Sequence, residues 1–340
     1  MPVVPVVVAQ TMKKTIPVEI QTIGNVEAYS NVSIKAQVTG IVTSVHFHQG
    51  QDVQKGDVLF EIDRRPFEVA LLQAQADLAR DKAKAQNSRI QAERYAKLFE
   101  QGVAARDQYD SARADADSQE ATVRADEAAI QNAKLNLEYC TITSPIDGRT
   151  GSVLVYPGNL TKANDVPILV VINQLVPIYM NFAVPEQYLG DVKKYMAAGS
   201  LRVMAEVPDQ PGTAEQGALS FIDNSVDNTT GTIHMKATFQ NAKRKLWPGQ
   251  YGTVVLTLTS EPNVTVVPAP AINVGQNGQY VYVIKPDNTA DSRAVTTGRT
   301  IGGETVVTSG LQPGETVVVD GQLRLVSGAR VSIKSGDAQK

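Results

Sequence analysis

Two long stretches without glycine or proline constrain this chain more than any other feature. They cover residues 67–101 and 103–144, and Gly102 alone separates them. Alanine, glutamine, glutamate, lysine, arginine and leucine dominate both, and these residues lose little rotamer freedom in a helix. At 1.5 Å per residue, about 35 residues make a rod of roughly 50 Å, longer than an ordinary core helix. The pattern predicts a helical hairpin over residues 66–138, with its turn at 101–107.

Heptad spacing predicts which faces of the two helices meet. The second helix has a nearly continuous 3,4 alternation with two polar interruptions, formed by Tyr109, Ala112, Ala116, Gln119, Val123, Asp126, Ile130, Ala133 and Leu137. The first helix offers an alanine-rich series formed by Val69, Leu72, Ala76, Ala79, Ala83 and Ile90. We therefore expect these two series to pack against each other.

Two similar β segments bracket the hairpin. In each, a short strand leads to a glycine turn and a second apolar strand, and ten residues separate Gly40 from Gly50 and Gly148 from Gly158. These four glycines and Gly56 are expected to supply the positive φ that tight strand connections require. Each half alone would leave an apolar face uncovered, so residues 35–65 and 139–172 are predicted to form one small sandwich.

The rest of the chain also reads as β structure. Short strand-like runs fill residues 11–34 and 173–260, and a change of composition after Pro262 marks another β domain. The N-terminal run 5–8 needs a sheet to join, and the sheet of that last domain is a candidate. The fold class expected is α+β, mostly β, in an elongated chain of nested domains.

Composition and motifs exclude several functions. The formal charge of −3 is spread over interleaved acids and bases, which argues against a nucleic-acid partner. The only cysteine, Cys140, is interpreted as a small buried hydrophobe. The chain has no catalytic motif or phosphate-binding loop and no apolar run long enough to span a membrane. His46 and His48 could share a metal, but no further ligand is apparent, so we predict no catalytic, cofactor or metal site.

With these features, the chain resembles the periplasmic adaptors, or membrane fusion proteins, of resistance-nodulation-division (RND) pumps, in the multidrug branch. Besides the two halves, which resemble those of a lipoyl domain, the resemblance rests on the stretches 221–227, 246–251 and 278–283. It implies four domains: an α-helical coiled-coil hairpin (66–138), a lipoyl-like sandwich (35–65 and 139–172), a β-barrel (11–34 and 173–260) and a membrane-proximal β domain (1–10 and 261–340).

The resemblance also implies a role and partners. An adaptor of this kind joins an inner-membrane RND transporter to an outer-membrane TolC-like channel, self-associates as a hexameric funnel, and takes its energy from the transporter's proton flux. It would be periplasmic and anchored to the inner membrane by an N-terminal segment or lipid.

In this family the hairpin tip docks the channel through an arginine, a leucine and a serine. Arg94 and Leu98 match the first two, whereas Ala105 stands in place of the serine. The resemblance thus assigns channel docking to Arg94, Leu98, Phe99, Gly102, Val103 and Ala105. The structural alternative is that Arg94 pairs with a neighbouring acid and Leu98 completes the helix seam.

Two other functions stay open at this point. Adaptors of ABC-type, ATP-driven exporters share the architecture, and the stretch 221–233 favours the proton-driven type. A lipoyl or biotinyl carrier would need a lysine at the exposed turn between the two halves, where this chain has Asp63-Arg64-Arg65-Pro66.

Overall fold

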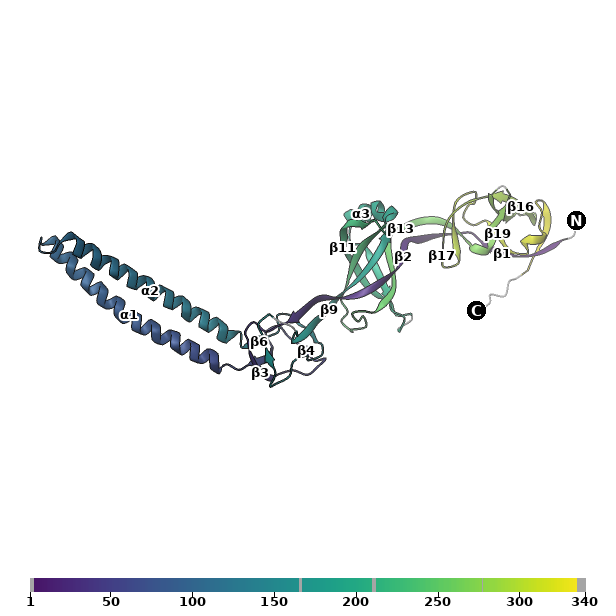
Figure 1. Ribbon diagram of the computed structural model, residues 1–340. Helices are drawn as coiled ribbons and strands as arrows, with labels where there is room; N and C mark the ends of the chain where they lie inside the picture. Colours follow the sequence, from purple (N-terminus) through teal and green to yellow (C-terminus); the bar gives the residue numbers. More distant parts are fainter. Residues whose placement is uncertain (1–2, 165–166, 210–211, 277, 335–340) are drawn as a thin grey trace. The chain divides into compact units, whose positions relative to one another are not determined.

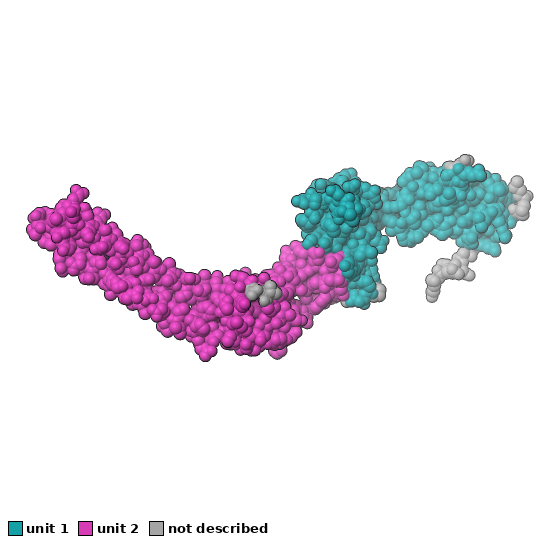
Figure 2. All heavy atoms as spheres, in the orientation of Figure 1, with its two compact units in different colours: residues 1–24, 181–237, 251–340 teal, residues 25–180, 238–250 magenta. Residues whose placement is uncertain are grey.

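The structure is a computed structural model that describes residues 3–164, 167–209, 212–276 and 278–334. Contacts divide the chain into two compact units (Figure 2). One unit comprises residues 1–24, 181–237 and 251–340, and the other comprises 25–180 and 238–250. This division into two units does not test the boundaries of the four expected domains, which stay a prediction. Their terminal residues 1–2 and 335–340 lie outside the described part of the chain.

The hairpin consists of α1 (Arg65–Glu100) and α2 (Arg106–Glu138), which lie side by side (Figure 1). Pro66 stands in the first turn of α1, where its missing N–H costs no helical hydrogen bond. An ion pair of 3.1 Å joins Lys82 to Glu127 between the helices. Neither helix is apolar enough over a sufficient length to cross a bilayer, and the same holds for every other described helix.

The predicted seam is confirmed for α2 and wrong for α1. All nine predicted α2 positions are buried or half-buried. On α1, by contrast, Val69, Leu72 and Ile90 are 66%, 64% and 45% exposed. The series that faces α2 is instead formed by Leu71, Ala74, Leu78, Asp81, Ala85, Ser88, Ala92 and Tyr95.

The physical reason for the error is that α1 carries two heptad series on opposite faces. The inner series contains Asp81 and Ser88, and the outer series has no polar residue from Val69 to Ala83. An assignment by hydrophobicity alone therefore chooses the outer face.

The two halves of the split sandwich (residues 35–65 and 139–172) form one structure. The first half supplies β3 (Gly40–Val45), β4 (Asp52–Val53) and β5 (Val58–Ile62), and the second supplies β6 (Thr141–Thr143), β7 (Gly148–Thr150) and β8 (Leu160–Thr161). β3 pairs with β8, β5 with β6, and β4 with β7. Each of these pairs joins a strand of the first half to a strand of the second. A single apolar core takes residues from both, including Val42, Phe60, Val153 and Ile172. The predicted sandwich is confirmed.

Matching hydrogen bonds show that the halves are structural repeats. The N–H of Gly50 donates to the carbonyl of Thr150 (3.1 Å), and the N–H of Gly158 donates to that of Val42 (2.8 Å). In return, the N–H of Thr150 donates to Gln51 (2.9 Å) and that of Val42 to Asn159 (2.9 Å). Each turn thus has hydrogen bonds to a strand of the other half in addition to its own, between Gln51 and His48 and between Asn159 and Tyr156.

The glycines of the repeat serve two different needs. Gly50, Gly56 and Gly158 have positive φ, as expected, whereas Gly40 and Gly148 do not. These two begin strands, and a Cβ on Gly148 would lie 2.7 Å from the carbonyl oxygen of Asn173. They are therefore needed for close approach and not for φ.

A closed barrel follows from the pairings of six strands. They are β2 (Met12–Ile34), β9 (Val170–Pro185), β10 (Arg202–Glu206), β11 (Glu215–Asp227), β12 (Thr232–Phe239) and β13 (Tyr251–Pro268). The order β13-β10-β11-β12-β9 closes because β2 pairs with both β13 and β9. Alternating burial along β9 and β12 directs one face of each into the core. After β9 come a single turn, η1 (Glu186–Tyr188), and α3 (Leu189–Ala198), which contacts β13.

The last β domain also closes on itself. Its strands are β1 (Val4–Gln10), β14 (Asn273–Gly275), β15 (Gly278–Ile284), β16 (Thr289–Ala294), β19 (Thr316–Asp320) and β20 (Ala329–Ile333), in the order β14-β15-β16-β20-β1-β19, with β19 returning to β15. Short 3-10 turns, η2 (Ala269–Ala271) and η3 (Gln322–Arg324), lie between strands, and the hairpin of β17 (Thr296–Ile301) and β18 (Glu304–Ser309) pairs with β13. Because β1 pairs with β19 and β20, the expectation that residues 5–8 join this sheet is confirmed.

Candidate docking site at the hairpin tip

The turn at the tip of the hairpin is built by backbone hydrogen bonds around Leu98. The carbonyl oxygen of Leu98 accepts from the N–H groups of Val103 (2.9 Å) and Ala104 (3.2 Å). Gly102 has φ +72°, the left-handed conformation that ends many helices, and its N–H donates to the carbonyl of Phe99 (2.9 Å). The sequence therefore fixes a tight reversal here, which holds the flanking side chains in defined positions.

The tip presents apolar side chains to solvent. Val103 is 73% exposed, and Phe99 is 40% exposed although its ring stacks on that of Tyr109, with centroids 5.4 Å apart. Leu98 is half-buried, so it contributes to the hairpin's own packing as well as to its surface. The stack orients Phe99 and leaves Val103 as the most accessible apolar group of the six predicted docking residues.

Arg94 lies one turn below the tip, on the surface of α1. The acid beside it, Glu93, contacts Arg89 at 3.3 Å. Within the described part of the chain, Arg94 itself forms no ion pair, so the pairing that offered a purely structural explanation for Arg94 is not found. A guanidinium without an internal partner can bind a carboxylate or carbonyl of another molecule.

Ala105 is the N-cap residue of α2 and has extended backbone. Its N–H donates to Oε1 of Gln108 (3.3 Å), which is half of a capping box. The other half needs a side-chain oxygen at residue 105, which alanine lacks. The N–H of Gln108, which such an oxygen would bind, donates instead to the carbonyl oxygen of Ala105 (3.1 Å).

Sequence reasoning missed an open groove beside the tip. Three α1 residues and five α2 residues line it: Ser88, Gln91, Tyr95, Asp107, Gln108, Ser111, Ala112 and Asp115. The two aspartates make it acidic, and no base lines it. Of the α1 residues in the groove, Ser88 is a polar member of the series that faces α2, a series that the sequence did not single out.

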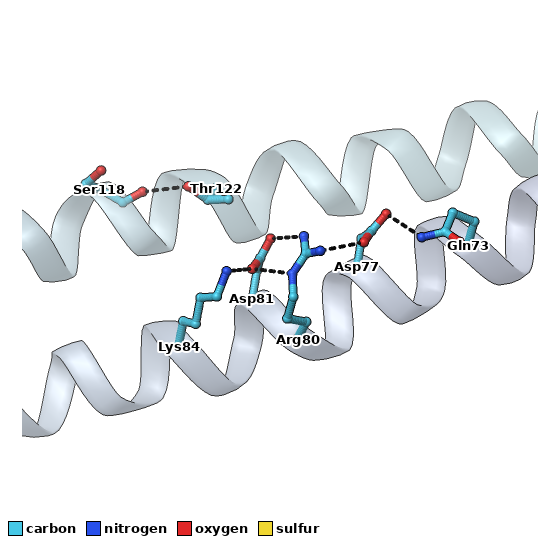
Figure 3. Close-up of polar contacts among 7 residues, drawn as sticks. All are labelled: Gln73, Asp77, Arg80, Asp81, Lys84, Ser118 and Thr122. Carbon is cyan, nitrogen blue, oxygen red and sulfur yellow. Dashed lines mark hydrogen bonds and ion pairs between the residues drawn. The ribbon is translucent and has the colours of Figure 1, made fainter.

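A second feature missed on α1 is a charged cluster inside the helix pair (Figure 3). Asp81 is only 5% exposed and receives hydrogen bonds from Arg80 (2.9 and 3.0 Å) and Lys84 (2.8 Å). Arg80 also reaches Asp77 at 2.9 Å. The hydrogen bonds from Arg80, then Lys84, hold the pKa of Asp81 well below its ordinary range.

Asp126 of α2 faces this cluster. Burial, and secondly the charge of Asp81, raise the pKa of Asp126, and its Oδ2 has no hydrogen-bond partner. Two seam carboxylates therefore oppose each other. Arg80 and Lys84 form hydrogen bonds with Asp81, and the charge of Arg80 offsets the raised pKa of Asp126 only in part.

The loop between β12 and β13, residues 240–250, contacts the split sandwich. Arg244 contacts Asp52 at 2.6 Å, and the guanidinium of Arg149 lies 5.4 Å from the centre of the Trp247 ring. Buried Asn241 holds the loop's shape through hydrogen bonds to Leu175 and Leu246. The stretch 246–251 thus has a structural role at this contact.

The two histidines are not brought together with other metal ligands. His46 contacts Ser44 (3.0 Å) and Glu61 (3.4 Å), and the N–H of His48 donates to Gln51. In the ranges that the structure describes, no three histidine, cysteine or acidic residues are grouped as a metal site would require. Cys140 is fully buried, and its Sγ contacts the carbonyl oxygen of Asn136 at 3.4 Å.

Comparison with known families accounts for these domains together. Three family models match in order along the chain: "RND MFP, barrel-sandwich hybrid domain" over residues 30–173, "RND MFPs, beta-barrel domain" over 177–260, and "RND MFPs, C-terminal permuted SH3 domain" over 263–324. The chain belongs to the RND-type membrane fusion proteins, the periplasmic adaptors of RND pumps.

Within that family the chain is similar to the multidrug resistance protein MdtA. It is 36% identical to MdtA of Erwinia amylovora over 334 residues, which cover 98% of this chain and 82% of the relative. It is also 36% identical to MdtA of Pantoea ananatis over 339 residues, or 99% and 83% of the two chains.

Solved structures show the same fold. A MacA-MexA chimeric protein with the Pseudomonas aeruginosa MexA α-hairpin domain has a TM-score of 0.63 at 25% identity, covering 92% of this chain and all of that one. MacA from Actinobacillus actinomycetemcomitans has a TM-score of 0.60 at 24% identity, with 92% and 99% covered, and supports the fold alone.

Proposed function

We propose that this protein is the periplasmic adaptor of a tripartite multidrug efflux pump. It joins an inner-membrane RND transporter to an outer-membrane TolC-like channel and assembles as a hexamer. An N-terminal segment or lipid anchors it to the inner membrane, and residues 1–10 and 261–340 form a membrane-proximal domain next to the transporter. The observation that carries the proposal is the exposed apolar tip of a long helical hairpin.

The tip binds the channel by burying apolar surface. Val103 and Phe99 lose contact with water when a partner covers them, and such rigidly held side chains lose little conformational entropy on binding. Arg94 adds direction through a hydrogen bond to an acidic or carbonyl group. Leu98 and Gly102 act mainly by holding the turn, and Ala105 leaves room where the family has a serine.

The adaptor works without chemistry of its own. The described residues offer arrangements suited to packing and hydrogen bonding, and the transporter supplies the energy through proton flux. All three matching family models are of the RND type, which favours this reading over service to an ATP-driven exporter.

Replacement of Val103 tests the proposal with little risk to folding, because the side chain is on the surface. The test uses a bacterial strain whose chromosomal copy of the gene is deleted and which carries the gene, or a variant of it, on a plasmid. Val103→Asp should lower drug resistance to near the level of the empty plasmid, since a carboxylate would be buried at the junction. Val103→Thr keeps the shape and should retain most resistance. Full resistance with Val103→Asp at equal protein level would refute tip docking.

A further inference from the structure

One turn of the last β domain holds apolar side chains out in water. It covers residues 321–328, between β19 and β20, and includes η3; we call it the apolar turn. Leu323 is 99% exposed and Val326 is 61% exposed. Single apolar residues on a surface are common, so the question is whether the fold fixes these two in place.

The fold fastens the apolar turn at its start and in its middle. Leu325, between the two exposed residues, is only 5% exposed and belongs to the core of the domain. Its carbonyl oxygen accepts a hydrogen bond from Oη of Tyr282 (2.8 Å). At the start of the turn, Gly321 has φ +91°, and a Cβ there would lie 2.7 Å from the carbonyl oxygen of Pro5. The backbone therefore holds the two apolar side chains outward.

Basic side chains accompany the apolar turn. They belong to the turn and to β20, and they are Arg324, Arg330 and Lys334, all exposed. Residues 321–334 contain no acid. The carboxylates of neighbouring segments are engaged: Asp291 pairs with a lysine between β15 and β16 at 3.5 Å, and Asp287 and Asp320 accept backbone N–H groups. The turn and the strand after it thus combine apolar and basic groups.

We propose that the apolar turn inserts Leu323 and Val326 into the surface of a membrane that contains anionic phospholipid, with Arg324 at the level of the phosphates. Apolar side chains gain free energy at the boundary between head groups and acyl chains, and basic side chains gain it from negative head groups. The inference rests on the proposed function, which anchors the chain to the inner membrane. It adds a membrane contact made by the folded domain itself.

The shape of the apolar turn favours a lipid surface over the transporter as its partner. A protein interface buries a packed centre in which tryptophan, tyrosine and arginine carry most of the binding, while leucine and valine are under-represented. Here two aliphatic side chains project from a turn. A fluid lipid surface accepts such side chains without a complementary pocket, whereas a protein partner needs one.

The apolar turn also lies beside the strand that an N-terminal anchor precedes. It follows β19, which pairs with β1, and Gly321 lies against Pro5 near the start of β1 (Figure 1). An anchor ahead of β1 therefore brings the turn to the same surface. Two apolar side chains bind a membrane weakly, but a tether raises their effective concentration. The anchor retains the protein at the membrane, and the turn orients its last domain.

Tryptophan fluorescence of the full chain on vesicles tests the insertion. The vesicles contain phosphatidylethanolamine and phosphatidylglycerol, and a histidine tag at the N-terminus binds each variant to a nickel-chelating lipid, in place of the anchor. Leu323→Trp should emit at a shorter wavelength on vesicles than in solution, and lipids brominated in their acyl chains should quench it. A Leu323→Trp variant that these lipids do not quench would overturn the proposal.

Two controls make this result specific to the turn. Ile23→Trp places the probe on β2 at a site that is 72% exposed, and its emission should neither shift nor be quenched. The parent chain, with Trp247 alone, gives the background. Equal quenching of Ile23→Trp and Leu323→Trp would mean that the whole surface adheres to lipid, and would also overturn the proposal.

Charge variants test the basic part of the contact. Adding Arg324→Glu to Leu323→Trp should lower the ratio of inserted to free turn at least about fivefold, the effect of one charge near an anionic surface. Arg324→Lys should retain insertion. Vesicles of phosphatidylcholine, which carry no net charge, should also give less quenching. Equal quenching in the two Arg324 variants, or on the two kinds of vesicle, would contradict recognition of anionic lipid.

The outcomes are separate from those of the docking proposal. Val103→Asp, which should lower drug resistance, should leave the quenching of Leu323→Trp unchanged when the two changes are combined. In cells, a photoreactive amino acid in place of Leu323 should form no adduct with the transporter. Such an adduct would make the turn a transporter surface and overturn this inference, while leaving docking at the hairpin tip intact.

Discussion

Ala105 has a defined structural position besides its proposed place in the docking site. The resemblance places a docking serine here, and the structure shows that the position is also the N-cap of α2. A serine hydroxyl at such a position can accept a hydrogen bond from the first turn of the helix. The missing hydroxyl therefore bears on the tip itself as well as on the proposed docking.

Ala105→Ser should complete the capping box with Gln108. We expect the start of α2 to become about 1 kcal/mol more stable, as for other N-cap substitutions. Hydrogen exchange should show slower exchange of the N–H groups at residues 107–109. Ala105→Val, which adds a side chain without a hydroxyl, is the matched control. Equal protection in the two variants would contradict the capping role.

The carboxylates of Asp81 and Asp126 should make the hairpin sensitive to pH in two opposite ways. The folded-state pKa of Asp126 is raised, so its contribution improves as pH falls from neutral through that pKa. The folded-state pKa of Asp81 is lowered, so the stability it provides is lost only as pH falls below the ordinary aspartate value. Mild acid should thus stabilise the helix pair before stronger acid destabilises it.

Asp126→Asn isolates the first effect. At pH 7 this variant should unfold at a higher temperature than the parent, as measured by circular dichroism at 222 nm. The gain in stability that the parent shows on mild acidification should disappear. At pH 7, Asp81→Asn should instead unfold at a lower temperature than the parent, because Arg80 and Lys84 lose their charged partner. An unchanged pH profile in Asp126→Asn would show that its carboxylate is not the titrating group.

At the scale of elements, the sequence allowed both helices, their turn, the split sandwich and the joining of residues 5–8 to the last sheet to be predicted. The helices and their turn follow from local composition, and the sandwich follows from a repeat that is visible within the single sequence. The face of α1 could not be predicted, because hydrophobicity favours Val69 and Leu72 over a series that contains Asp81. Knowing that the aspartate is satisfied by Arg80 and Lys84 requires the structure.

Two alanine substitutions in α1 test the corrected seam. Leu78→Ala should destabilise the helix pair by about 2 kcal/mol, since it removes methyl groups packed against α2. Leu72→Ala should change stability by less than about 0.5 kcal/mol, because the side chain is 64% exposed. Thermal unfolding followed at 222 nm compares them. A larger loss of stability in Leu72→Ala than in Leu78→Ala would instead support the seam predicted from hydrophobicity alone.

At the scale of the whole molecule, every domain except the hairpin is assembled from segments distant in sequence. The hairpin interrupts a sandwich whose halves close each other's turns, through Gly50 and Gly158, and β1 completes a sheet made from the far end of the chain. The candidate docking residues were chosen from the resemblance, whereas the exposure of Val103 and the stack of Phe99 on Tyr109 could be learned only from the structure.

Cross-linking from the tip in living cells tests the central claim most directly. A photoreactive amino acid replaces Val103, and a second variant carries it at Leu72 as the control on the shaft. In cells whose drug resistance depends on this chain, the probe at position 103 should form an adduct that contains the outer-membrane channel, and the probe at 72, on the shaft, should form none with the channel. Resistant cells in which position 103 gives no channel adduct would contradict the account.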